Sequence, residues 1–227
     1  MPNWCNNTFE LVAPKEKIRE FESFLNEKNG KEWFDFFLPC PQELKDVGDV
    51  SINHTNEQLV EKYGYSDWYS WSLDKWGCKW NCDAQDWRVE DYDDDNLSMR
   101  FWFDSPWGPP TELYKFISEQ DDLNVFAHYH EEGMGFVGRF EYGEDESYEY
   151  DIEDLSSLDG IPEEIIDEWN LREMLEDWAE NNEEDEEELI EDDEVSNAEE
   201  ADLEAALDDL KKDFDELMKE EQNGKNK

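Results

Sequence analysis

The aromatic residues of this chain are distributed unevenly, and their distribution limits what the chain can fold into. Its 227 residues include 11 Trp, 13 Phe and 9 Tyr, yet only Trp169, Trp178 and Phe214 of these follow Gly160. Disordered acidic chains are poor in large aromatic side chains, whereas folded cores are rich in them. The sequence therefore predicts a folded domain over residues 1–155 and a tail of different character over residues 156–227.

Acidic residues outnumber basic ones along the whole chain, with 66 Asp and Glu against 19 Lys and Arg and a formal net charge of -47. Residues 161–227 alone carry 29 acidic and 6 basic residues. A surface this negative repels nucleic acids and anionic membranes, and it attracts basic proteins or metal cations. We therefore expect no direct binding of nucleic acid and no membrane binding.

The sequence has no feature typical of a membrane-spanning or exported chain. No apolar run approaches the roughly 20 residues that cross a bilayer, and the first residues, MPNWCNNTFELV, lack the basic flank and apolar core of a signal peptide. We therefore expect a cytoplasmic protein. In that compartment the cysteines are expected to be free thiols rather than disulfides, at Cys5, Cys40, Cys78 and Cys82.

The spacing of apolar residues predicts both strands and helices in the domain. Alternating apolar positions predict strands over residues 3–13, 79–93, 96–107, 123–133 and 135–151. Spacings of three and four predict helices near residues 14–29 and 109–122, and a short helix over 66–77. Residues 31–65 are less regular and give no prediction. The resulting order resembles the split βαβ arrangement, so we expect an α+β, ferredoxin-like antiparallel sheet with helices on one face.

The apolar faces of these predicted elements define a predicted core. Eight of its members are Phe9, Leu11, Phe21, Leu25, Phe101, Phe103, Phe116 and Phe136. They come from three strands and two helices, so their joint burial would fix the packing of helices on the sheet.

The tail contains two helical patterns, which predict an acidic helical tail with helices near residues 162–180 and 198–220. The second pattern is a heptad seam of about two and a half repeats, formed by Leu203, Leu207, Leu210, Phe214 and Leu217. A helix with so short a seam is marginal unless the seam is covered. We expect it to pack against the first tail helix, against the domain, or against a second copy in a homodimer.

Four segments of the domain together resemble a known family. They are MPNWCNN at residues 1–7, KWGCKWN at 75–81, FWFDSPWGPPTEL at 101–113 and EEGMGFVGRF at 131–140. In this order they resemble the Api92-like, YubB-type ferredoxin-like family of phages and mobile elements. The resemblance covers residues 1–150 and implies the fold, a host-cytoplasm location if the chain is phage-encoded, and no particular activity. Cys78 and the SPWGPP turn depart from the family pattern, and the acidic tail lies outside it.

Two groups of residues could hold a metal or act as catalysts. Cys78 and Cys82 have a CxxxC spacing, but structural zinc sites more often use a tighter pair. His128 and His130 share one face of a predicted strand, but no third partner is positioned beside them. The sequence also lacks a Gly-rich phosphate loop, a nucleophile elbow and an HExxH motif. We therefore predict no catalytic residue, no metal site and no cofactor.

Seven tryptophans of the domain could stack on bases or pack in the core: Trp68, Trp71, Trp76, Trp80, Trp87, Trp102 and Trp107. Base-stacking platforms are accompanied by Lys and Arg that hold phosphates. Because residues 1–160 carry 37 acidic and only 13 basic residues, we favour packing in the core and at interfaces.

The densest acidic run holds ten carboxylates in the twelve positions 183–194. In a helix these charges would lie about 1.8 Å apart along the axis, close to the roughly 1.7 Å per charge of duplex DNA. Carboxylates of residues 91–95 and 141–155 could extend this surface. The predicted partner-binding residues are Asp91, Asp93, Asp94, Asp95, Glu183, Glu184, Asp185, Glu186, Glu187, Glu188, Glu191, Asp192, Asp193 and Glu194.

Three functions fit this pattern. The favoured hypothesis is a non-enzymatic phage or mobile-element protein that binds a basic, nucleic-acid-handling host or defence protein, acting as a DNA mimic and counter-defence inhibitor. The second is an adaptor that binds a partner through its tail helices, with the acidic residues serving only solubility. The third and least favoured is a metal-dependent enzyme in the ferredoxin-like domain.

Overall fold

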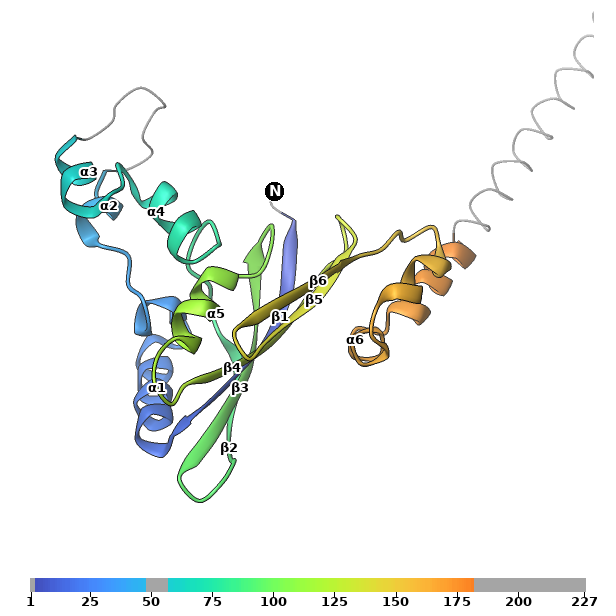
Figure 1. Cartoon of the computed structure of the whole chain (residues 1–227), viewed down its shortest axis with the longest axis horizontal. Coiled ribbons are helices and arrows are strands. Elements are labelled where there is room, and N and C mark those ends of the chain that lie inside the picture. Colours follow the sequence, from blue (N-terminus) through green and yellow to red (C-terminus); the bar gives the residue numbers. More distant parts are fainter. Residues whose placement is uncertain (1–2, 48–56, 182–227) are drawn as a thin grey trace, which may run out of the picture. The chain divides into compact units, whose positions relative to one another are not determined.

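The computed structural model describes residues 3–47 and 57–181, in which six strands form one sheet (Figure 1). The strands are β1 (Trp4–Pro14), β2 (Gln85–Asp91), β3 (Asn96–Pro106), β4 (Asn124–Glu131), β5 (Phe136–Glu141) and β6 (Glu144–Glu149). Their order in the sheet is β2-β3-β1-β4-β5-β6, and every neighbouring pair is antiparallel.

Apart from the first, the helices before residue 171 are short. They are α1 (Lys15–Lys28), η1 (Trp33–Phe36), α2 (Gln42–Lys45), α3 (Glu57–Tyr63), α4 (Trp68–Lys75), α5 (Thr111–Ser118), η2 (Leu155–Gly160) and α6 (Glu163–Glu168). The series β1-α1-β2-β3-α5-β4 is the split βαβ arrangement, so the predicted ferredoxin-like fold is confirmed. The final hairpin, β5 and β6, extends the sheet beyond β4.

Local sequence explains where α1 begins and ends. Pro14 precedes its first residue, and Ile18, Phe21 and Leu25 form the buried stripe. The helix stops because Asn29 and then Gly30 adopt left-handed conformations. Any larger residue at Gly30 would clash with the backbone just before β2, since an added Cβ would lie 2.3 Å from the carbonyl oxygen of Ala84.

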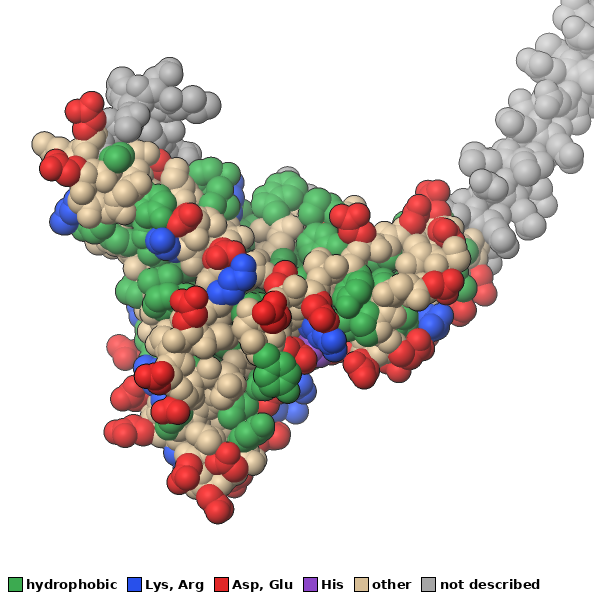
Figure 2. All heavy atoms as spheres, in the orientation of Figure 1, with side chains coloured by type: hydrophobic (Ala, Val, Ile, Leu, Met, Phe, Trp, Pro, Cys, Tyr) green, Lys and Arg blue, Asp and Glu red, His purple; other side chains and the backbone are tan. Residues whose placement is uncertain are grey.

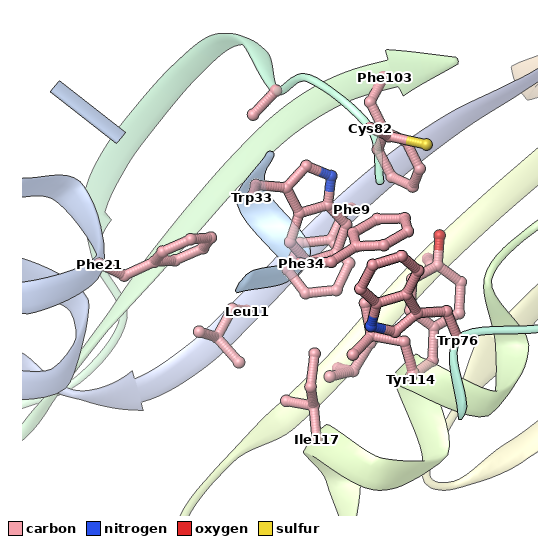
Figure 3. Close-up of a cluster of buried hydrophobic side chains, with 14 of the residues drawn as sticks. Phe9, Leu11, Phe21, Trp33, Phe34, Trp76, Cys82, Phe103, Tyr114 and Ile117 are labelled. Atoms are coloured by element: carbon pink, nitrogen blue, oxygen red, sulfur yellow. The ribbon is translucent and has the colours of Figure 1, made fainter. Parts of the chain in front are cut away.

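The core lies between one face of the sheet and the layer of α1, η1, α4 and α5, as Figure 3 shows for some of its side chains. Phe9 on the central strand β1 pairs with Phe101 on β3 and Ala127 on β4. Trp33 of η1 lies over them, with its ring centroid 4.8 Å from that of Phe9 and 5.2 Å from that of Phe101. Six of the eight predicted core residues are fully buried here: Phe9, Leu11, Phe21, Leu25, Phe101 and Phe103.

The other two predicted core residues, Phe116 and Phe136, are only half-buried. On α5 the buried stripe consists of Leu113, Tyr114 and Ile117. Phe116 lies beside this stripe on the helix surface, so its side chain is only partly covered. Phe136 is the first residue of β5, where the helical layer no longer covers the sheet fully.

The strand predicted over residues 135–151 is two strands. Tyr142 and Gly143 both have positive φ, 53° and 82°, and form a two-residue hairpin loop between β5 and β6. Tyr is an unusual residue at a position with positive φ, so the turn is only weakly predicted from the residue types.

The opposite face of the sheet is partly covered by residues 155–172. Trp169 packs on His130 and on Trp102, with centroid distances of 5.4 and 6.2 Å. The residues from Met1 to Arg172 form one compact unit and those from Glu173 to Lys227 a second, so the division lies beyond the compositional boundary at residue 155.

The helix predicted near residues 162–180 is interrupted. It consists of α6 and a second helical stretch over residues 171–181, separated by Trp169 and by Asn170, whose φ is 50°. A left-handed residue cannot continue an α-helix, so the chain changes direction there. The helix predicted near 198–220, its Leu203 to Leu217 seam and the acidic run 183–194 lie outside the described residues.

Candidate partner-binding surface

The turn between β2 and β3 brings together the four acidic residues predicted in the domain. Asp91, Asp93, Asp94 and Asp95 are all exposed, and Figure 2 shows acidic side chains gathered at this tip. Asp93 is used by the turn itself, because its Oδ1 accepts hydrogen bonds from the backbone N–H groups of Asp95 and Asn96 at 2.9 and 2.8 Å. The side-chain amide of Asn96 also donates to it, and these bonds hold the pKa of Asp93 below its ordinary value.

The same turn is tied to the start of α1. The Lys15 Nζ donates to the carbonyl oxygen of Asp94 at 2.7 Å, and the Lys15 backbone N–H donates to that of Asp95 at 3.2 Å. The tip is therefore anchored to the start of α1 through its backbone carbonyl groups. It leaves Asp91, Asp94 and Asp95 as the carboxylates that can meet a partner.

A second acidic surface runs along β6, the edge strand at the other side of the sheet. Every residue of β6 is exposed except the half-buried Tyr148, and Glu144, Glu146 and Glu149 are among them. Residues 151–154 continue the surface with Asp151, Glu153 and Asp154, all exposed. An edge strand also presents backbone N–H and C=O groups that no neighbouring strand occupies.

Basic residues are nearly absent from this half of the domain. Residues 116–171 contain 18 acidic residues and a single Lys or Arg, Arg139. The Arg139 guanidinium is already held by Glu146, at 2.7 Å, and by Glu164, at 3.5 Å. Lys115, just before this interval, pairs with Glu112 at 2.9 Å and also acts electrostatically on Asp145 and Glu144, so the acidic excess around β6 is only partly compensated. Sequence reasoning could have found this surface from the long interval without Lys or Arg.

The two acidic surfaces are on opposite edges of the sheet. With strands about 4.8 Å apart, five spacings separate β2 from β6 by about 24 Å. The structure thus brings Asp91 to Asp95 together, but it does not bring them next to residues 141–155. A partner that contacts both must span the width of the sheet.

A groove follows the free edge of β6. It has a volume of about 460 Å³ and is lined by Ser147, Tyr148, Glu149, Ser157, Gly160 and Ile161. Behind it, Tyr129 reaches across β5 and donates a hydrogen bond to the Asp145 carboxylate at 3.0 Å. Burial raises the pKa of Tyr129 above its ordinary value. Asp145 is exposed as a residue, but its carboxyl group is partly desolvated, which raises its pKa as well.

The two histidines predicted to share a strand face do so, but they have separate partners. His128 Nδ1 is hydrogen-bonded to the Glu168 carboxylate, and its Nε2 lies 3.6 Å from Glu141. The bond to Glu168 raises the pKa of His128, whereas burial lowers the pKa of His130 to about 4. His130 Nε2 lies 2.7 Å from the Tyr150 hydroxyl. The arrangement fastens α6 to the sheet, and only the structure reveals Glu168 as the partner.

All four cysteines are free thiols and are buried. Burial raises the pKa of Cys40 to about 11 and that of Cys5 further, so both thiols are protonated at neutral pH. Within the described ranges, no group of three or more His, Cys, Asp or Glu side chains is placed to hold a metal ion.

The tryptophans are divided between core and surface. Trp71 and Trp76 are buried, as core packing requires, whereas Trp102 and Trp107 are each 48% exposed. Trp102 lies on the face of the sheet that carries Trp169. Arg100, two residues before Trp102, is paired with Glu10 at 3.5 Å and so is not free to hold a phosphate beside this ring.

None of the helices within residues 3–47 and 57–181 has both the length and the apolar character that a membrane span requires.

Comparison with known proteins gives one family and one structure. A family model described as the ferredoxin-like domain in Api92-like protein matches residues 86–210. The crystal structure of a protein api92 from Yersinia pseudotuberculosis matches with 13% sequence identity and a TM-score of 0.34, covering 66% of this chain and 99% of that chain. No curated protein matches the sequence.

Proposed function

Because the chain belongs to the family defined by the ferredoxin-like domain of Api92-like proteins, we propose that its domain is a non-catalytic binding module for a basic protein. The observation that carries the proposal is the excess of carboxylates around β6, where residues 116–171 hold 18 acidic residues and only Arg139 as a base. With Arg139 already paired to Glu146 and Glu164, a partner rich in Lys and Arg would supply the missing cations.

The partner that fits best is an extended basic segment. The free edge of β6 offers backbone hydrogen-bonding groups. An added strand would place its side chains alternately against Glu144 and Glu146 on one face of the sheet and against Asp145 and Glu149 on the other. The groove along this edge leaves room for such a segment. Self-repulsion in a chain of net charge -47 would be relieved by this contact.

In the finer form of the proposal, the partner is a nucleic-acid-handling host or defence protein and the chain is of phage or mobile-element origin. Proteins that bind DNA present Lys and Arg to phosphates, so an acidic surface can compete for the same groups. DNA should then displace this protein from its partner. Binding should also weaken steeply between low and moderate salt, because exposed charges are screened.

A set of neutral variants tests the proposal. One variant carries Glu144→Gln, Glu149→Gln and Glu153→Gln at the β6 edge, and another carries Asp91→Asn, Asp94→Asn and Asp95→Asn at the β2–β3 tip. Glu146 and Asp93 are left unchanged because Arg139 and the turn depend on them. The matched control carries Glu27→Gln, Glu57→Gln and Glu61→Gln, which are exposed residues on α1 and α3.

The readout is affinity for a partner captured from a host lysate at low salt, measured by biolayer interferometry at several salt concentrations. We expect the β6 variant to lose affinity several-fold, mainly through slower association, and the control to keep it. A third variant that neutralises Glu183 to Glu188 measures the contribution of the acidic run. Equal affinity in all variants, or a complex indifferent to salt and to competing DNA, would support the adaptor hypothesis instead.

A further inference from the structure

A pocket walled by tryptophans lies at the other end of the domain from β6, beside α4. It has a volume of about 240 Å³, which is below the roughly 300–1,000 Å³ of pockets for drug-sized ligands. Its aromatic wall consists of Trp68, Trp76 and Trp80, and Cys40 and Ser72 also line it. Its polar rim consists of Glu32, Lys45 and Asn81. The size suits a small head group or a single side chain.

The three indole rings surround this space instead of stacking on each other. Trp76 is held from behind by Phe34 and Trp71, at centroid distances of 5.3 and 5.0 Å, and its Nε1 donates to the carbonyl oxygen of Leu38 at 2.9 Å. Trp68 and Trp80 are half-buried and make their ring contacts elsewhere, with Tyr69 and Trp4. Several aromatic rings around one small cavity can recognise alkylated ammonium groups.

The charges at the rim leave a net negative potential. Lys45 is paired with Asp35, at 3.3 Å, and Asn81 donates to the other oxygen of that carboxylate at 3.0 Å. The Lys45 ammonium is therefore neutralised within the pocket wall. Among the residues that the structure describes, no Lys or Arg forms an ion pair with Glu32. Asp83 lies close to it, since the Asp83 carboxylate accepts the Glu32 backbone N–H at 3.1 Å. A cation entering the pocket would meet unpaired carboxylate charge.

The backbone at Glu32 has an uncommon conformation. Its φ is 54°, in the left-handed region that only a few per cent of non-glycine residues adopt. The bond to Asp83 holds that conformation, at the point where the chain enters η1. Strained positions of this kind are concentrated at ligand sites.

We infer that this pocket binds an organic cation with an alkylated ammonium group, held by the faces of Trp68, Trp76 and Trp80 and by the Glu32 carboxylate. The Trp80 ring already attracts an ammonium group of its own chain, because Lys79 Nζ lies 5.0 Å from its centroid while Lys79 itself does not line the pocket. The same chemistry is present in a free quaternary amine and in a methylated lysine side chain of a protein. This inference is independent of the acidic surface around β6.

Isothermal titration with three probes tests the inference. The probes are choline, its neutral isostere 3,3-dimethylbutanol, and a short peptide with one trimethyllysine, each added to the full chain. We expect choline to bind at least about tenfold more tightly than the isostere. The two molecules have the same shape, but only choline carries the positive charge that the aromatic rings and the Glu32 carboxylate attract. A peptide that binds more tightly than choline assigns the site to a methylated protein, and the reverse assigns it to a free amine.

Two pairs of variants identify the pocket as the site. Glu32→Gln and Trp80→Leu should each weaken choline binding by roughly threefold to tenfold, whereas Glu27→Gln and Trp107→Leu, which change an exposed acid and an exposed Trp outside the pocket, should not. If Trp80→Leu fails to fold, Glu32→Gln still decides the question, because Gln keeps the size of the side chain. Equal binding of choline and its isostere, absence of binding by choline and the peptide, or equal affinity in Glu32→Gln, would each overturn the inference.

Discussion

Phe101 is the residue on which the core packing converges. Its ring lies 5.0 Å from that of Phe9, 5.2 Å from that of Trp33 and 6.0 Å from that of Phe21, so it joins β1, η1 and α1. Offset and edge contacts of this kind add to the free energy gained from burial alone. Replacing the ring removes contacts with three elements at once.

Phe101→Ala should lower the free energy of unfolding by about 3–5 kcal/mol, which is the usual cost of removing a fully buried Phe. Phe116→Ala is the matched control, because Phe116 is only half-buried and should cost roughly half as much or less. Urea unfolding followed by tryptophan fluorescence measures both. Equal losses would show that the register of β3 differs from the one described.

The two histidines on the opposite face should respond to pH with opposite signs. Burial lowers the pKa of His130 to about 4, below the ordinary value near 6.5, so protonation favours the unfolded chain. Its neutral form contributes stability that is complete above about pH 6.5 and is lost as the pH falls towards 4. The pKa of His128 is raised by Glu168, so its contribution is present below about pH 6.5 and is lost as the pH rises through the raised value.

The measurement is the free energy of unfolding of wild type, His130→Gln and His128→Gln between pH 8 and pH 4. The advantage of wild type over His130→Gln should shrink by roughly 1–3 kcal/mol from pH 7 to pH 4. The advantage over His128→Gln should instead grow between pH 8 and pH 6. Differences that stay constant across the range would contradict both assignments.

At the scale of elements, the hairpin of β5 and β6 depends on one glycine. An added Cβ at Gly138 would lie 2.4 Å from the Tyr129 hydroxyl oxygen and 2.4 Å from the carbonyl oxygen of Glu146. The missing side chain is what allows the Tyr129 ring to cross β5 and reach Asp145. The edge strand β6 is thus held by the side chain of Tyr129 as well as by its backbone hydrogen bonds to β5.

Gly138→Ala should destabilise the protein by about 1–3 kcal/mol, the usual cost of overpacking, and should weaken amide-exchange protection in β6 first. Gly160→Ala is the control, since nothing lies within 4 Å of a Cβ there and its φ is ordinary. Hydrogen exchange followed by mass spectrometry reads both. If β6 keeps full protection in Gly138→Ala, then Tyr129 does not support the hairpin.

At the scale of the whole molecule, residues 155–172 belong with the sheet and not with a separate tail. Val12 and Val137 are buried on the face that carries Trp169, and Leu158, Ile161, Ile165 and Ile166 are buried in the covering segment. A chain ending at Asn181 retains the whole first compact unit. A chain ending at Asp154 loses η2 and α6 and exposes the apolar residues beneath them.

We therefore expect the chain that ends at Asn181 to keep the Tm of the full chain to within a few degrees. The chain that ends at Asp154 should melt at a lower temperature and aggregate, because an apolar patch is left uncovered. Differential scanning calorimetry and light scattering compare the two. Equal Tm values for the two chains would show that the folded domain needs no residue after Asp154, and the domain boundary would then lie at residue 155.

The net charge of -47 should make stability depend on salt. Self-repulsion destabilises a compact state, and salt screens it over a Debye length of about 10 Å at 0.1 M. The Tm should therefore rise between 0.02 and about 0.3 M NaCl. KCl should have the same effect and sucrose at equal osmolality a smaller one, which separates screening from osmotic stabilisation. A Tm that is independent of salt would show that the acidic residues are spaced too far apart to repel.

The sequence by itself determined the βαββαβ order and six of the eight core residues, because alternation and helical spacing are local patterns that a single sheet face and its helices impose. It also determined that Asp91 to Asp95 share one turn. Only the tertiary structure decided the rest. Strand order placed β2 and β6 at opposite edges of the sheet, about 24 Å apart, because β1 lies between β3 and β4, which do not neighbour it in sequence. Side-chain contacts over long separations, such as Glu168 with His128 and the tryptophans around Glu32, depend on how the layers pack, and no periodicity in the sequence encodes them.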